Sequence, residues 1–67
     1  MRILVRVIGK EPNTAELPTA ATVGELLAAQ GVNPVTMIAT VGGRLVPEDA
    51  ELTDGDEVVL YPAVSGG

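Results

Sequence analysis

The chain has 67 residues, enough for one small domain but not for a large internal pocket, since folding at this size buries only about 60% of the unfolded surface. It has no cysteine and no histidine, which excludes disulfides, thiolate nucleophiles and the usual general base and transition-metal ligands. A net charge of −5 disfavours nucleic acid, and no apolar run reaches the about 20 residues of a membrane span. We therefore expect a soluble cytoplasmic protein that is not a self-contained enzyme.

The opening run, residues 2–8, is rich in β-branched side chains, and every second residue from Ile3 to Val7 is β-branched and apolar, which predicts a strand. One face of this strand is apolar and is expected in the core: Ile3, Val5 and Val7. The other face mixes basic and apolar side chains, which is unusual for a purely solvated surface: Arg2, Leu4, Arg6 and Ile8. A turn over residues 9–13 and a short return strand over residues 14–17 complete a predicted hairpin.

A helix is predicted to begin at Thr22, because Thr22 and Glu25 have the spacing of a capping box. Three apolar residues at helical spacing would face the core: Val23, Leu26 and Leu27. Gly31 suits the left-handed position that follows the end of a helix, and Pro34 prevents its continuation. The result is a short helix of about two turns.

The next pair of predicted strands covers residues 36–41 and 44–46, joined by Gly42-Gly43 in a tight hairpin turn that needs positive φ. After this hairpin, Leu52 is expected to fill the bottom of the core. Three acidic residues lie between this hairpin and Leu52: Glu48, Asp49 and Glu51. Clustered carboxylates can bind cations, but a run of charges is more typical of a solvated loop, so no metal site is predicted.

The last predicted strand covers residues 57–61 and is expected to stop at Pro62. Its alternation directs two apolar side chains inward, Val58 and Leu60, and two outward, Val59 and Tyr61. If this strand pairs with the first one, the outward side chains form one surface, which we call the docking patch: Leu4, Arg6, Ile8, Val59 and Tyr61. The element order predicts an α+β domain over residues 1–62, with a mixed sheet of four to five strands and one helix across one face.

Residues 63–67 are predicted to form a flexible tail. Ser65, Gly66 and Gly67 would be narrow enough to enter the active site of a partner, because glycine has no Cβ. From Pro62 onward the chain could extend about 20 Å. The carboxylate of Gly67 is the reactive group of the tail, so we expect the chemistry to occur there.

Five segments together resemble one known family: residues 1–7, the helix from Val23, the hairpin over 41–46, the stretch 52–58 and the ending 64–67. They are similar to the ubiquitin-like β-grasp proteins, and within them to the small sulfur carriers and archaeal ubiquitin-like modifiers. Ubiquitin has arginines before its final glycines; the ending here is closer to the molybdopterin-synthase small subunit and the archaeal modifiers. The resemblance implies the β-grasp fold.

The resemblance also implies a function that is carried out with partners. An E1-like enzyme would adenylate the Gly67 carboxylate with ATP, and this chain would bind no cofactor itself. A sulfurtransferase or cysteine desulfurase would then supply sulfur for a thiocarboxylate, used in tRNA thiolation or in molybdopterin or thiamine synthesis. Otherwise the carboxylate would form an isopeptide bond with a lysine of a target protein, which a deconjugating metalloprotease could reverse. Neither nucleic acid nor a membrane is an expected direct partner.

Two alternatives stay open from the sequence. The chain could be a β-grasp interaction module whose tail has no covalent chemistry. Lys10, the only lysine, is a possible acceptor if copies of the chain are joined to one another, although an exposed lysine in a turn is ordinary.

Overall fold

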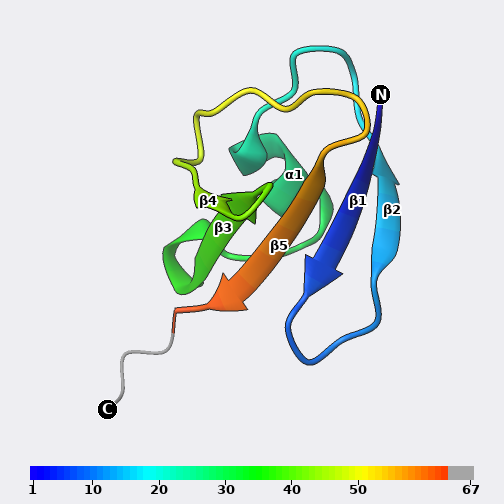
Figure 1. The fold of residues 1–67 in the computed structure, drawn as a ribbon. Helices are drawn as coiled ribbons and strands as arrows, with labels where there is room; N and C mark the ends of the chain where they lie inside the picture. Colours follow the sequence, from blue (N-terminus) through cyan, green and yellow to red (C-terminus); the bar gives the residue numbers. More distant parts are fainter. Residues whose placement is uncertain (64–67) are drawn as a thin grey trace.

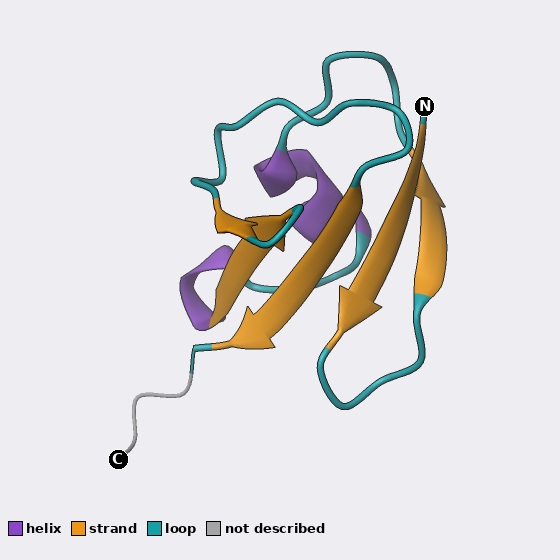
Figure 2. Cartoon of the chain, viewed as in Figure 1, coloured by secondary structure: helices purple, strands orange, loops and turns teal. Residues whose placement is uncertain are grey.

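Five strands form one mixed sheet, and an α-helix packs against one face of it (Figures 1 and 2). The computed structural model describes residues 1–63. In chain order the elements are β1 (Arg2–Val7), β2 (Asn13–Glu16), α1 (Val23–Ala29), the 3-10 turn η1 (Pro34–Thr36), β3 (Met37–Val41), β4 (Arg44–Leu45) and β5 (Glu57–Pro62). The sheet order is β2-β1-β5-β3-β4, in which β1 and β5 are parallel and the other neighbours antiparallel. The predicted α+β architecture is confirmed.

The core lies between α1 and the inner face of the sheet. The side chains predicted to point inward from β1 and β5 are all buried: Ile3, Val5, Val7, Val58 and Leu60. The helix contributes Val23, Leu26 and Leu27, and Leu52 is buried with them. Because burying one such aliphatic side chain contributes about 1.5–3 kcal/mol, a slip of either strand by one residue would be strongly unfavourable.

Both predicted ends of α1 are present. The Glu25 N–H donates to Thr22 Oγ1 at 3.3 Å, and the Thr22 N–H donates to Glu25 Oε1 at 3.4 Å, which completes the capping box. At the other end Gly31 has a φ of +70°, and its N–H donates to the Ala28 carbonyl oxygen at 3.1 Å. A left-handed glycine after the last turn is thus what ends this helix.

Several strand boundaries differ from the prediction by one residue. Ile8 lies just outside β1, although its N–H still donates to the Leu60 carbonyl oxygen at 3.1 Å. Thr36 belongs to η1 and not to β3, because the turn has its own hydrogen bonds. The Val35 N–H donates to Asn33 Oδ1 at 2.9 Å, and the Thr36 N–H donates to the Asn33 carbonyl oxygen at 3.0 Å.

β5 continues through Pro62, which corrects the prediction that the strand stops before it. Pro62 lies opposite Met37, and the following Ala63 N–H donates to the Thr36 carbonyl oxygen at 2.7 Å. Successive backbone nitrogens of a strand point to opposite sides. The Ala63 nitrogen points toward η1 and β3, so the Pro62 nitrogen, which has no hydrogen to donate, points away from β3. Pairing with β1 has already ended at Leu60, and no neighbouring strand needs that missing donor.

Candidate functional site

The sequence left open whether the first and last strands pair, and the structure places them side by side. Arg6 lies opposite Val59 in the parallel pairing of β1 and β5. Beyond the end of β1, the Ile8 N–H reaches the Leu60 carbonyl oxygen, next to Tyr61. The outward side chains of the two strands therefore share the outer face of the sheet, which is the face away from α1. The members of the docking patch lie together there, and their role in docking stays a prediction.

The large apolar side chains of the docking patch are half-exposed. Their exposed fractions are 38% for Leu4, 42% for Tyr61 and 48% for Ile8. Val59 is less exposed and lies on the central strand of the sheet. Each side chain thus has one side packed against the sheet, which restricts its motion, and one side open to a partner.

An ion pair crosses the docking patch. Arg6 Nη2 lies 3.2 Å from Glu57 Oε2, and about half of each side chain is exposed. An exposed pair of this kind contributes only about 0–1 kcal/mol to stability. A partner that covered the pair would have to keep it bonded or offer replacement groups, because an unpaired buried charge is costly. Arg6 and Glu57 are therefore better placed to select a partner than to stabilise the fold.

Ile38 belongs to the same surface, although it was not among the predicted members of the docking patch. In the antiparallel pairing of β3 and β5, Ile38 lies opposite Tyr61, and Thr40 lies opposite Val59. Directly opposite residues share a face, so Ile38, which is 43% exposed, extends the apolar surface to a third strand. The alternation of β3 was visible in the sequence, but the side that points outward depends on how β3 pairs with β5.

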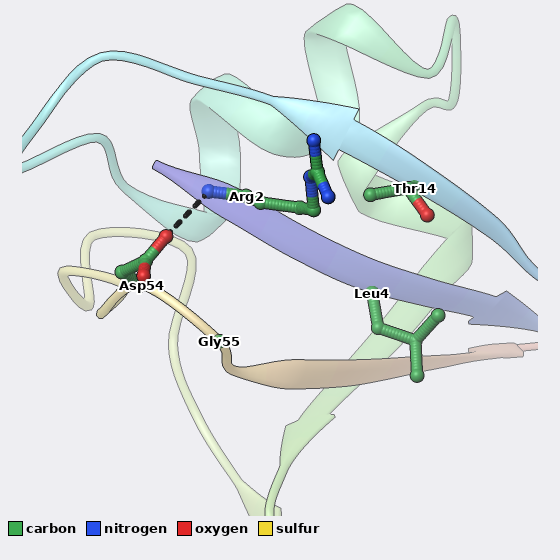
Figure 3. A pocket seen from close by; sticks show the side chains of 5 residues that line it. All are labelled: Arg2, Leu4, Thr14, Asp54 and Gly55. Atoms are coloured by element: carbon green, nitrogen blue, oxygen red, sulfur yellow. Dashed lines mark hydrogen bonds between the residues drawn. The ribbon is translucent and has the colours of Figure 1, made fainter.

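A surface pocket lies beside the start of β1 (Figure 3). Its lining residues are Arg2, Leu4, Thr14, Asp54 and Gly55. The Arg2 N–H donates to Asp54 Oδ1 at 2.7 Å, drawn as the dashed line in Figure 3. The pocket measures about 280 Å³, slightly below the range of about 300–1,000 Å³ that is typical of small-molecule sites.

Ala63, the last described residue, is the tail root from which residues 64–67 continue. Its N–H is bonded to the Thr36 carbonyl oxygen of η1. Two residues earlier, Tyr61 lies opposite Ile38 on the outer face. The tail root is thus at the same end of the sheet as the apolar side chains of Ile8, Ile38 and Tyr61.

Three predicted site residues lie outside the described residues: Ser65, Gly66 and Gly67. Their entry into a partner and the reaction at Gly67 stay predictions. Lys10, the possible acceptor, is exposed in the turn after β1, where its backbone N–H donates to the Val7 carbonyl oxygen at 2.9 Å. Because β1 and β5 are parallel, this turn lies at the same end of the sheet as the tail root.

The loop with Glu48, Asp49 and Glu51 shows no metal site. Within residues 1–63, no group of three or more acidic side chains is placed to hold an ion. In the same part of the chain, no helix is long and apolar enough to cross a membrane.

Comparison with known sequences follows the chain almost from end to end. Residues 4–67 match the sequence profile of the ThiS family. The molybdopterin synthase sulfur carrier subunit of Escherichia coli (strain K12) is 37% identical over 59 residues, which cover 79% of this chain and 73% of that protein.

Comparison with solved structures agrees with the expected fold. SAMP1 from Haloferax volcanii superposes with a TM-score of 0.79 over 100% of both chains, at 21% sequence identity. A protein–protein complex of subunits 1 and 2 of the molybdopterin-converting factor from Helicobacter pylori 26695 contains a chain that superposes with a TM-score of 0.71, again over 100% of both chains and at 26% identity. The ubiquitin-like β-grasp fold is thereby confirmed.

Proposed function

Because this chain belongs to the ThiS family, we propose that it carries sulfur as a thiocarboxylate on Gly67, formed after a partner enzyme activates the carboxylate with ATP. The family match and the relatives establish the coarser function, that of a sulfur carrier or ubiquitin-like modifier of this type. Such proteins are small carriers and not catalysts themselves. The catalytic groups accordingly belong to the partners.

The proposed reaction begins with the Gly67 carboxylate, which is a poor electrophile at neutral pH. One carboxylate oxygen attacks the α-phosphorus of ATP, pyrophosphate leaves, and an acyl-adenylate forms. The terminal sulfur of an enzyme persulfide, carried by a sulfurtransferase or cysteine desulfurase, then attacks the acyl carbon, and AMP leaves. A thiol reductant cleaves the resulting acyl disulfide, which releases the thiocarboxylate and leaves the oxidised thiol as a disulfide with the sulfur-carrying enzyme. Gly66 and Gly67 have no side chains, which lets the partner's groups approach the reacting carbonyl closely.

The observation that carries this proposal is the position of the tail root at the apolar end of the outer face. Ile8, Ile38 and Tyr61 lie at the end of the sheet where Ala63 leads into the tail. Gly67 is four residues further on, so a protein docked on this face has the carboxylate within about 14 Å of Ala63. The same face can thus provide the binding energy for the enzyme that acts on Gly67.

Among sulfur acceptors, we favour the molybdopterin pathway over thiamine synthesis and tRNA thiolation. The E. coli relative is a molybdopterin synthase sulfur carrier subunit, and the H. pylori structure is a complex of subunits 1 and 2 of a molybdopterin-converting factor. By analogy, this chain would dock through its outer face on a second subunit that receives the sulfur.

Conjugation to lysines of target proteins, with removal by a metalloprotease, is the second candidate. The resemblance to the archaeal modifiers favours it, but the likeness to SAMP1 supports the fold alone at 21% identity. Lys10 is the only lysine, so any linkage between copies through a side-chain amine would form there.

Intact mass spectrometry tests the proposal. The chain is incubated with ATP, an adenylating enzyme from the same organism and a sulfur donor. We expect a nucleotide adduct when sulfur is withheld, and the replacement of one carboxylate oxygen by sulfur when it is supplied. The variant that lacks Gly66 and Gly67 is the control and should show neither product. If the full chain forms no adduct but still binds a partner through its outer face, it is an interaction module without covalent chemistry.

A further inference from the structure

Val35 is 84% exposed, the highest value among the exposed large hydrophobic side chains of residues 1–63. A single exposed apolar residue is ordinary on a protein surface, so its position decides whether it matters. Val35 directly precedes Thr36, whose carbonyl oxygen accepts the Ala63 N–H at 2.7 Å. The exposed valine therefore lies one residue away from the contact that holds the tail root.

The turn that presents Val35 is held by its own hydrogen bonds. Asn33 Oδ1 accepts the Val35 N–H at 2.9 Å, while the Thr36 N–H and hydroxyl both donate to the Asn33 carbonyl oxygen at 3.0 Å. Pro34, at the first position of the turn, fixes its own φ. Figure 2 shows this turn beside the start of β3 and the end of β5. Val35 is thus presented by ordered backbone, and little conformational freedom is lost when it meets a partner.

The two segments that meet at the tail root carry no charged side chain, although the net charge of the whole chain is −5. The two segments that meet there, residues 33–38 and 60–63, contain no Asp, Glu, Lys or Arg. They do contain Val35 on η1 and, on the outer face, Ile38 and Tyr61. We call Val35, Ile38 and Tyr61 the apolar collar. Its chemistry matches an uncharged, apolar partner surface and not a basic one.

The length of the tail requires that a partner come close to the collar. Gly67 is four residues beyond Ala63, and four extended residues span at most about 14 Å. A protein that encloses Gly67 in an active site must therefore approach Ala63 and whatever surrounds it. A partner docked only on the outer face would meet Ile38 and Tyr61, whereas one that surrounds the tail would also meet Val35.

We propose that the apolar collar seats against an uncharged, apolar rim at the mouth of the activating enzyme's active-site channel, with Val35 as a contact separate from the docking patch. This inference rests on the function proposed above, because it names the partner that acts on Gly67. The rim would fix the direction in which the tail enters, since the bond from the Ala63 N–H to the Thr36 carbonyl oxygen holds the tail root against η1.

Substitution of Val35 by aspartate tests the collar. The control variant Thr19→Asp adds the same charge at an exposed position in the loop after β2. This loop lies at the end of the sheet where β1 begins, because Glu16 pairs with Arg2. Both variants should keep the wild-type urea midpoint, because both sites are exposed. We expect kcat/KM for adenylation by the activating enzyme to fall about tenfold or more for Val35→Asp, through a higher KM, and to change less than twofold for Thr19→Asp. The nearly isosteric Val35→Thr should give a smaller loss in the same direction.

Two results would contradict the inference. Equal kcat/KM for Val35→Asp and Thr19→Asp, with a wild type that is adenylated normally, would overturn the collar and leave the proposed function intact. A wild type that is not adenylated at all would reject the proposed function and the collar with it. Methyl NMR provides a second measurement: on addition of the enzyme without ATP, the Val35 methyl signals should broaden or shift. Unchanged Val35 methyl signals beside perturbed Ile38 methyl signals would also overturn the inference.

Discussion

Replacing Ile8 by aspartate is expected to weaken docking while the domain stays folded. Ile8 is 48% exposed and lies just past β1, and its backbone bond to the Leu60 carbonyl oxygen needs no side chain. About half of the side chain is buried, so the loss of about half of 1.5–3 kcal/mol lowers the unfolding free energy by about 1 kcal/mol. A central apolar contact in an interface contributes about 2 kcal/mol or more. This loss corresponds to about thirtyfold weaker binding.

The assay is calorimetric titration of the activating enzyme with the wild type, Ile8→Asp and the charge-matched Thr19→Asp, each first checked by urea unfolding. Thr19→Asp should bind like the wild type, because residue 19 is far from the end of β1 along the sheet. The reasoning is refuted if Ile8→Asp binds as tightly as Thr19→Asp. An unfolding loss far above about 1 kcal/mol would instead contradict the half-exposed placement of Ile8.

Three stability predictions follow from the same structure and are measured by urea denaturation. Leu26→Ala removes a fully buried side chain and should cost about 2–5 kcal/mol, and a cost below about 1 kcal/mol would contradict its place in the core. Helix propensity predicts that Gly24→Ala raises the unfolding free energy by about 1 kcal/mol. We expect no such gain, because the added Cβ would lie 3.2 Å from the Glu48 carbonyl oxygen; a clear gain would show that the loop with Glu48 moves aside at little cost. Ala20→Gly should stabilise by up to about 1 kcal/mol, since Ala20 has a φ of +70°, and a loss would show that the unfolded-state entropy of glycine outweighs the relief.

The sequence alone determined the local elements and the direction of most side chains. Alternation along residues 2–8 identified Ile3 and Val5 as core, and the spacing of Thr22 and Glu25 identified the start of the helix. These patterns depend on neighbours two to four residues apart, whose geometry is set by the backbone itself. The docking patch could be named in advance because it follows from the same alternation once the two strands are assumed to pair.

Only the tertiary structure decided which segments meet. The sheet order puts β3 beside β5, and this brings Ile38 to the outer face and η1 to the tail root. It also lets β5 pass through Pro62, because β1 has ended on the side where the proline lacks a donor. The tertiary structure also places the carbonyl oxygen of Glu48, in the loop after β4, against Gly24 in the first turn of the helix, where helix propensity by itself would favour alanine. Contacts between residues more than twenty positions apart depend on the packing of the whole core, and no short window of sequence contains that information.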